Sequence, residues 1–241
     1  MARVPRFFAS LSERRGFSAT VTAVEHPSPG LLRIAFEGPE LRTRPFAPCD
    51  VTAFRISSND FRHYTPERVD AGAGRATILF HRHPLSAAPG LVFVEGLEVG
   101  SEVVLCGMAS ARNFRWTSPD SALAMGDSTT LGLMVGLTDR ARAEGRALRV
   151  AVEVEAGDLA YVRGLLPDAV VVEETAEPGE ALDKWLARSA PEIRKSGPSA
   201  VYLAGHGGSV QRQRAVLRES VGLDRRTIHT QPYWATGKVG L

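Results

Sequence analysis

The feature that most constrains this fold is a change of hydrophobic pattern at Ser118 and Pro119. Before it, from Phe17 to about Trp116, short apolar runs alternate with polar residues and are separated by turn sequences such as PSPG and AGAG. This alternation is typical of antiparallel strands that form a barrel or a sandwich. The runs are FSATVTAV (17–24), LLRIAFEG (31–38), DVTAFRI (50–56), RATILFH (75–81) and EVVLCG (102–107).

After that point, apolar strands alternate with amphipathic helices, a pattern that predicts βαβ units and a parallel sheet. We therefore predict two domains: an antiparallel β-barrel over residues 1–118 and a doubly wound α/β domain over residues 119–241. Ligands of such sheets bind at the carboxyl ends of the strands, where the barrel could close over them. The segments are SALAM (121–125), a helix over 129–144, ALRVAVEV (147–154), AVVVEE (169–174), AVYLAG (200–205) and a helix over about 209–220.

Composition excludes several classes of protein. A formal charge of +2 is far from the concentrated basic surplus of a nucleic-acid binder. Cys49 and Cys106 have no CxxC or CxxH spacing, so we predict neither a zinc site nor a disulfide framework and expect both to be buried. The sequence has no apolar core of signal-peptide length and no run of roughly 18 apolar residues. We expect no membrane span and a cytoplasmic location.

The sequence RHYT, which begins at Arg62, ends one of the strand-like segments. The period of a strand places Arg62 and Tyr64 on one face and His63 and Thr65 on the other, unless the chain has already turned. A guanidinium suits phosphate oxygens, a phenol ring stacks on a flat ring, and a hydroxyl can bond a ring nitrogen. A strand-end tyrosine with ordinary surface neighbours is the alternative that this pattern leaves open.

Two strand-to-helix turns lie in the second half. GDSTTLG (126–132) places Asp127 or Ser128 as the N-cap of a helix that faces a ligand or simply packs on the sheet. AGHGGSV (204–210) resembles GxGxxG without its last glycine, which is a weak signal. His206 has no partner at metal-ligand spacing, so we predict no metal site. Neither GxSxG nor HExxH occurs, so a hydrolase has no support.

RHYT resembles the RxYT flavin motif of the ferredoxin-reductase superfamily. The chain as a whole resembles one branch, the siderophore-interacting proteins, which are FAD-binding ferric-siderophore reductases. This resemblance implies a flavin-binding barrel followed by a ferredoxin-reductase-like α/β domain. Its collinear segments are RGFSATVTAVEHPSPGLLRIAFEGPEL (15–41), RHYT, the strand ending in His81, AMGDSTTLG (124–132), YLAGHGGSVQRQRAVLRE (202–219) and PYW (232–234).

The resemblance also implies residue roles. Arg62 would bind the flavin pyrophosphate or the ring edge, Tyr64 would stack on the isoalloxazine, and Thr65 would lie near its reactive nitrogen. Tyr64 and Thr65 are thus the catalytic candidates. His81 matches the histidine that ends the following strand. Further cofactor-binding candidates are Arg68, Ala88, Gly90, Asp127, Ser128, Thr129, Gly205, His206, Tyr233 and Trp234.

Four places depart from the family pattern. Glu67 stands where the family has an arginine, so either the loop shifts and Arg68 serves, or the cofactor is held less tightly. AAPG (87–90) replaces a GPAS-like turn, and the apolar, β-branched run after it encodes a helix poorly. Ser128 and His206 replace two acidic residues of the nicotinamide half.

The expected function is an FAD-dependent oxidoreductase that passes electrons from NAD(P)H or ferredoxin to a ferric siderophore. Arg112, Arg115 and Lys238 are candidate cations for an anionic siderophore. The departures leave two alternatives open. The fold could serve a non-redox enzyme acting on a small organic substrate in specialised metabolism, or a siderophore- or flavin-binding protein without turnover.

Overall fold

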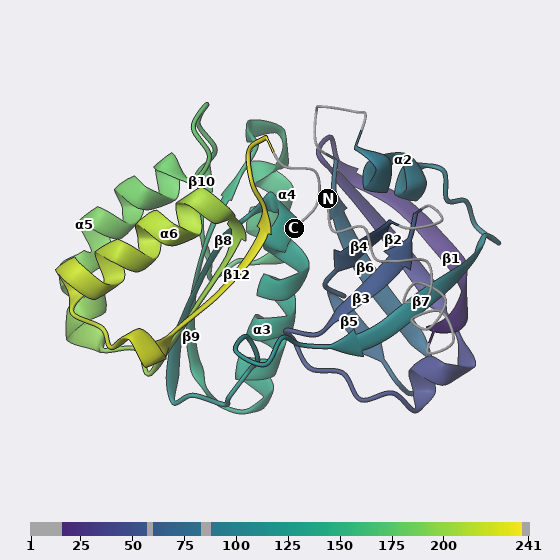
Figure 1. Ribbon diagram of the computed structural model, residues 1–241, viewed down its shortest axis with the longest axis horizontal. Coiled ribbons are helices and arrows are strands. Elements are labelled where there is room, and N and C mark those ends of the chain that lie inside the picture. The colour runs from purple at the N-terminus through teal and green to yellow at the C-terminus, as the bar shows by residue number, and fades with distance from the viewer. Residues whose placement is uncertain (1–15, 57–59, 83–87, 238–241) are drawn as a thin grey trace.

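The computed structural model describes residues 16–56, 60–82 and 88–237 (Figure 1). The first part is a seven-stranded antiparallel sheet in the order β4-β3-β7-β1-β2-β6-β5, so the prediction of antiparallel strands is confirmed. All five predicted runs are strands of this sheet. Its strands are β1 (Gly16–Ser28), β2 (Leu31–Glu37), β3 (Val51–Arg55), β4 (Phe61–Tyr64), β5 (Arg68–Asp70), β6 (Arg75–His81) and β7 (Glu102–Ala109), with a short helix η1 (Pro39–Arg42) after β2.

The two edge strands of this sheet are consecutive in sequence. Hydrogen bonds do not close the barrel, because β4 and β5 stand at opposite ends of the strand order. Residues 65–67, which we call the seam, connect them covalently. Pro66 has no N–H to donate, whereas the amide of Glu67 donates to the carbonyl of Thr77 on β6 at 2.7 Å. The end of the RHYT motif therefore lies in the seam.

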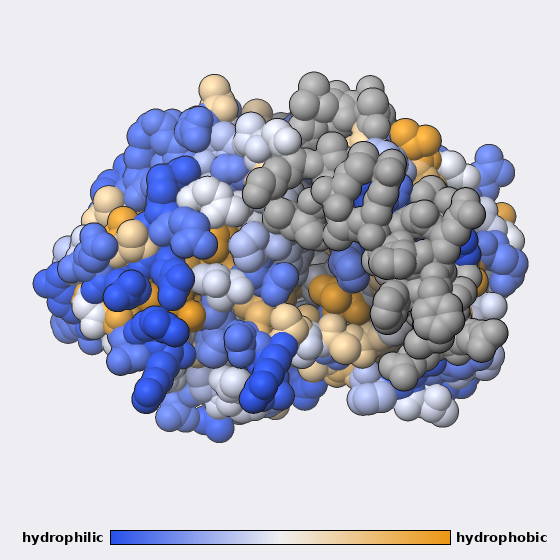
Figure 2. Space-filling model, in the orientation of Figure 1, coloured by the Kyte–Doolittle hydropathy of each residue, from blue (hydrophilic) through white to orange (hydrophobic). Residues whose placement is uncertain are grey.

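The second part is a five-stranded parallel sheet in the order β10-β9-β8-β11-β12, which confirms the predicted parallel sheet and adds β12, a strand that was not predicted. Helices α3 and α4 cover the face nearer the barrel, and α5 and α6 cover the other face (Figure 1), where the surface is mostly hydrophilic (Figure 2). The strands are β8 (Ser121–Asp127), β9 (Ala147–Val154), β10 (Val170–Glu173), β11 (Ala200–His206) and β12 (Ile228–Trp234). The helices are α3 (Leu131–Ala143), α4 (Leu159–Leu165), α5 (Glu180–Ser196) and α6 (Gly207–Val216), with one-turn segments η2 (Ser128–Thr130), η3 (Ala156–Asp158), η4 (Leu217–Val221) and η5 (Arg225–Thr227).

Helix α3 lies between the two sheets and contacts the seam (Figure 1). A Cβ added to Gly132 would lie 2.6 Å from the carbonyl oxygen of Thr65, and one added to Gly136 would lie 3.4 Å from Pro48. Two glycines four residues apart share one face of a helix. That bare face allows the backbone of α3 to approach the barrel at the seam, which places the barrel beside the carboxyl end of the parallel sheet.

Several sequence expectations need correction. A helix, α2 (Pro89–Glu95), does form at the AAPG turn, because Pro89 presets the first helical φ angle and Leu91 and Val94 bury their side chains. Cys49 is buried as predicted, but Cys106 is only half-buried. Among the described residues, no helix is both long and apolar enough to cross a membrane.

Candidate functional site

Two side chains of β4 face the start of α2. Arg62 and Tyr64 are half-buried and His63 between them is exposed, as expected along a strand, whereas Thr65, predicted on the face of His63, lies beyond the strand and is buried. A Cβ added to Gly90 would lie 2.7 Å from the hydroxyl of Tyr64 and 3.0 Å from Cγ of Arg62. Ala88 immediately precedes the helix. The structure therefore brings four of the predicted cofactor residues together, and a glycine is needed for that approach.

The ring of Tyr64 packs against aromatic residues of the barrel core. Its centroid lies 4.7 Å from that of Phe80 and 5.7 Å from that of Phe54, both in edge-to-face geometry. Burial raises the pKa of Tyr64 to about 12, against the lowering effect of the Arg62 charge. Tyr64 is therefore a neutral phenol whose ring orientation is fixed by its neighbours.

Arg62 has no carboxylate partner among the residues that the structure describes. Its Nη1 donates to the backbone carbonyl of Phe61 at 2.9 Å. A half-buried guanidinium without an acidic partner is suited to phosphate oxygens. Since this charge lies beside Gly90 and Tyr64, the arrangement fits the diphosphate of FAD.

The hydroxyl of Thr65 connects the seam to the C-terminal strand. Thr65 is buried, and its Oγ1 lies 2.7 Å from the hydroxyl of Tyr233 on β12. Burial raises the pKa of Tyr233, while the bond to Thr65 lowers it by a smaller amount. This hydrogen bond joins residues 168 positions apart and fixes β12 against the barrel.

Glu67 and Arg68 form ion pairs with residues other than Arg62. Glu67 is 1% exposed, and its carboxylate accepts from Nε of Arg33 at 2.9 Å and from Nη2 of Arg33 at 2.5 Å. Arg68 is exposed and donates to Asp139 of α3 at 2.7 Å. The carboxylate of Glu67 is thus neutralised by a cation of β2. The charges of both residues are therefore paired within the described part of the chain.

Asp127 lies at the carboxyl end of β8 and accepts hydrogen bonds from three elements. Its Oδ1 accepts from the amide of Thr129 at 3.0 Å, so Asp127 is the predicted N-cap of η2. Its Oδ2 accepts from the amide of His206 at 2.7 Å and from Nε1 of Trp234 at 2.9 Å. A Cβ on Gly205, whose φ is +102°, would lie 2.3 Å from this carboxylate. Asp127 therefore holds the β8 and β11 turns and β12 together.

The His206 ring caps α6 and packs on an aromatic face. Its Nδ1 lies 2.9 Å from Oγ of Ser209, and its Nε2 lies 3.2 Å from Oγ1 of Thr236. The ring centroid lies 4.6 Å from that of Trp234. Burial lowers the pKa of His206, the charge of Arg212 lowers it further, and Asp127 acts in the opposite direction. Within the described ranges no group of His, Cys, Asp or Glu could hold a metal ion.

A cavity of about 260 Å³ lies at the carboxyl ends of β8, β9 and β10. We call it the acidic cavity, because four carboxylates line it and none of its described lining residues is Lys or Arg. His81 of the barrel reaches it, with Nε2 3.3 Å from a carboxylate oxygen of Glu155. Its described lining residues are His81, Asp127, Ser128, Thr129, Glu155, Ala156, Glu173, Glu174, Thr175 and Trp234.

The residues at this edge do not fit the phosphates of NAD(P)H. Asp127 already accepts from the turns at the starts of α3 and α6, where a phosphate would otherwise be bound. Glu153, on the neighbouring strand, accepts from the amides of Gly179 at 2.6 Å and Leu182 at 3.0 Å at the start of α5. Side-chain carboxylates therefore occupy the anion-binding positions of this edge.

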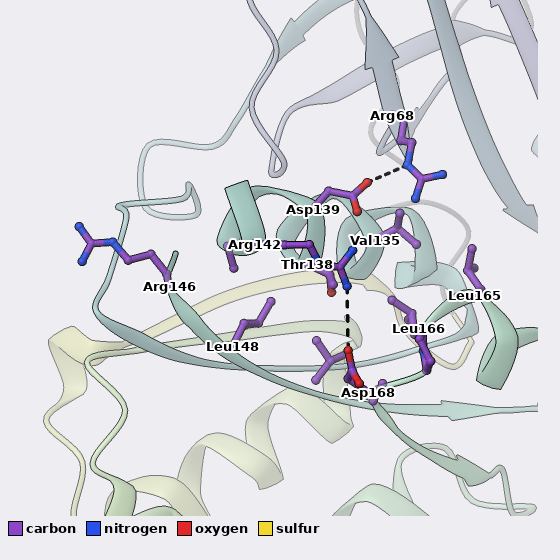
Figure 3. Close-up of a pocket in the computed structure, with 14 residues that line it drawn as sticks. Arg68, Val135, Thr138, Asp139, Arg142, Arg146, Leu148, Leu165, Leu166 and Asp168 are labelled. Atoms are coloured by element: carbon purple, nitrogen blue, oxygen red, sulfur yellow. Dashed lines mark hydrogen bonds and ion pairs between the residues drawn. The ribbon is translucent and has the colours of Figure 1, made fainter. Parts of the chain in front are cut away.

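A larger cavity, of about 350 Å³, is lined by α3, β9 and the segment at the end of α4 (Figure 3). Its arginines are already paired: Arg68 with Asp139, and Arg142 with Asp168 at 3.9 Å. Arg146, which also lines it, contacts Asp120 at 2.6 Å. These pairs leave no free charge for a ligand, so we do not place the site there.

Arg112 and Arg115, two of the predicted substrate cations, do not line the acidic cavity. Arg112 and Arg115 are exposed on the connection between β7 and β8, near His229 at the start of β12, whereas Trp234 ends that strand. Lys238 lies outside the described residues.

Sequence reasoning missed the acids of β9 and β10. Glu155, Glu173 and Glu174 follow the apolar runs ALRVAVEV and AVVV, at the carboxyl ends of two parallel strands. Polar residues at that position are the signal that could have identified them. Arg33 was missed as well, because no local sequence pattern predicts an ion pair between β2 and the seam.

Comparison with known proteins agrees with this geometry. The family model of the siderophore-interacting proteins matches residues 119–237, which is the described parallel-sheet part and about half of the chain. A comparison with curated protein sequences finds no match.

Solved structures share the fold over both parts. The siderophore-interacting protein of Acinetobacter baumannii has 17% identity and a TM-score of 0.73, with 92% of this chain and 91% of that one covered. SipS of Aeromonas hydrophila, also a siderophore-interacting protein, has 22% identity and a TM-score of 0.70, with 93% of each chain covered. Phthalate dioxygenase reductase has 18% identity and a TM-score of 0.75, with 94% and 70% covered. Residues 119–237 therefore form a siderophore-interacting protein domain by the family match, and the whole chain shares the fold of solved siderophore-interacting proteins.

Proposed function

We propose that this protein is an FAD-dependent oxidoreductase that passes electrons to a ferric siderophore and receives them from a reduced electron-transfer protein such as ferredoxin. The observation that carries the proposal is Arg62: a half-buried cation without an acidic partner in the described part of the chain, beside Tyr64 and the start of α2. The family match and the reductase fold support the same chemistry.

Bound FAD would supply the redox step, since it takes up two electrons and can release them singly to Fe(III), which then leaves its chelator more readily as Fe(II). The residues of this chain have binding and positioning roles. Arg62 would neutralise the diphosphate of FAD. Tyr64, whose own ring is held by Phe80 and Phe54, would position the flavin ring. The bond between Thr65 and Tyr233 would hold the second domain over the ring edge.

A protein donor is favoured over NAD(P)H because Asp127 and Glu153 occupy the anion-binding positions of the parallel sheet. A ferredoxin delivers one electron at a time and needs only an approach to the flavin edge, without a nucleotide in the cleft. We place this activity in the cytoplasm, where such donors are found.

The test begins with FAD titrated into the purified apoprotein. We expect saturable binding and a yellow complex, and we expect Arg62→Ala to weaken binding about tenfold or more, because a charge-assisted phosphate contact is lost. Arg75→Ala is the matched control, since Arg75 is an exposed β6 arginine paired with Glu37. If the purified protein binds no FAD, the proposal is wrong.

The second stage mixes FAD-loaded, chemically reduced protein with a ferric hydroxamate chelate and follows Fe(II) with a coloured ferrous chelator. We expect one Fe(II) for each electron stored. Reduction should also proceed with reduced ferredoxin and not with NADPH. A yellow protein that is reduced but never reduces the ferric chelate would be a flavin-binding protein without this turnover.

A further inference from the structure

The acidic cavity concentrates negative charge, and none of its described lining residues is Lys or Arg. Its four lining carboxylates come from the ends of β8, β9 and β10, and the buried Glu153 lines a smaller cavity together with Asp127 and Glu174. Burial, together with the charges of Glu153, Glu155 and Asp127, raises the pKa of Glu174 to about 7. The nearest cation that lines the cavity is His81, which is charged only when protonated. The cavity therefore favours a ligand that brings positive charge.

Asp127 and Glu153 contribute this charge without being free to move away. Each carboxylate accepts hydrogen bonds from backbone N–H groups at the start of a helix, so neither side chain is free to move and make room for an anion. Trp234 also lines the cavity, and its indole N–H is bonded to Asp127. An aromatic ring beside fixed carboxylates is a common environment for an ammonium group.

A second, independent observation is the hydroxyl of Ser128. Ser128 lines the cavity and is 4% exposed, and its Oγ has no hydrogen-bond partner among the described residues. A buried hydroxyl without a partner is costly, so such a group usually has a ligand or a water as its partner. A hydroxyl can accept from an ammonium N–H, so the unpaired group matches the charge of the cavity.

We propose that the acidic cavity binds a small organic cation with an ammonium group and excludes NAD(P)H. Its carboxylates would accept from the ammonium, and Ser128 would accept the remaining N–H. A volume of about 260 Å³ admits an aliphatic amine of a few carbons. The proposal does not depend on flavin chemistry, because it concerns binding alone and would hold for the apoprotein too.

The test is isothermal titration calorimetry of the full chain at neutral pH and low salt, with cadaverine, a five-carbon diamine, as the probe. Pentanediol of the same length is the neutral control ligand. We expect cadaverine to bind with one site per chain and at least about tenfold more tightly than the diol. NADPH should give no saturable heat.

Variants locate the site. Glu155→Gln with Glu174→Gln should weaken cadaverine binding about tenfold or more, and Ser128→Ala should weaken it about threefold to tenfold. Glu192→Gln is the matched control, because Glu192 is an exposed acid of α5 paired with Arg149 outside the cavity. Circular dichroism checks folding, and Ser128→Ala, which removes one atom, keeps the test decisive if the double variant unfolds.

Three results would overturn the proposal: no saturable binding of cadaverine, equal binding of the diol, or unchanged binding in Ser128→Ala and the folded double variant. NADPH binding that these same substitutions alter would overturn it too. Failure of FAD to bind would contradict only the redox function, so the two proposals can fail separately.

Discussion

The ion pair between Arg33 and Glu67 offers the sharpest test of how the seam is held. Glu67 is 1% exposed and the Arg33 side chain is 23% exposed, with two hydrogen bonds between them. At an effective dielectric constant of about 20, unit charges roughly 4 Å apart attract by about 4 kcal/mol, and desolvation offsets much of this. Removing one partner is different, because it leaves a buried charge uncompensated.

We therefore expect Arg33→Met to lower the free energy of unfolding by about 3 kcal/mol, the low end of the usual 3–5 kcal/mol. The low end applies because Nη1 of Arg68 remains 3.6 Å from the Glu67 carboxylate. Arg33→Met with Glu67→Leu should return to within about 1 kcal/mol of wild type, since both charges then leave together. Urea denaturation followed by circular dichroism measures each value.

The matched control is Arg75→Met, which removes an ion pair between β6 and β2 in which both side chains are about half exposed. An exposed pair contributes about 0–1 kcal/mol, so this change should be small. The reasoning would be refuted by a loss below about 1 kcal/mol in Arg33→Met, or by a double variant less stable than the single one. FAD affinity should be equal in wild type and the double variant. Tighter binding in the double variant would show that Glu67 faces the phosphates after all.

Three further predictions concern the contact between the domains and the acidic cavity. Tyr233→Phe removes the bond to Thr65 and should cost about 0.5–1.5 kcal/mol in urea denaturation. Gly132→Ala places a methyl group 2.6 Å from a seam carbonyl and should cost about 1–3 kcal/mol, whereas Gly164→Ala, with open space around it, should be neutral or stabilising. Because the pKa of Glu174 is raised to about 7 in the folded protein, the folded state holds more protons than the unfolded one between roughly pH 4.5 and pH 7. Glu174 should therefore lower the stability as pH rises through that window, and Glu174→Gln should flatten this part of a stability-against-pH curve; an unchanged slope would contradict the raised pKa.

The sequence predicted most of the fold because most strands of both sheets carry strong local patterns, although β5 and β12 were not predicted. Helix α5 went unpredicted, since Pro191 inside it reads as a breaker. The helix forms because Leu182, Trp185, Leu186 and Ile193 bury one face on the sheet, which outweighs the lost hydrogen bond. Helix α2 was underestimated for a related reason, as burial of Leu91 and Val94 overrides the β propensity of its residues.

The sequence predicted the contacts between residues that lie near one another along the chain, but not those between residues far apart. Arg62, Tyr64 and Gly90 meet as the motif implies. The contacts of Asp127 could not be predicted, because they join residues 79 and 107 positions apart. The same holds for Thr65 and Tyr233. Such contacts depend on how β12 pairs with β11, and no local pattern encodes that pairing.

The contacts of Asp127 explain why His206 replaces one of the two acidic residues that the family resemblance leads one to expect in the nicotinamide half. A glutamate in place of His206 would bring a second carboxylate beside Oδ2, which lies 2.7 Å from the amide of that residue. Two carboxylates so close repel and raise each other's pKa. A histidine whose pKa is lowered by burial stays neutral there, and it still caps α6 through Nδ1. Asp127 can thus remain a structural acceptor for three elements, while the other carboxylates of the acidic cavity lie at the ends of β9 and β10.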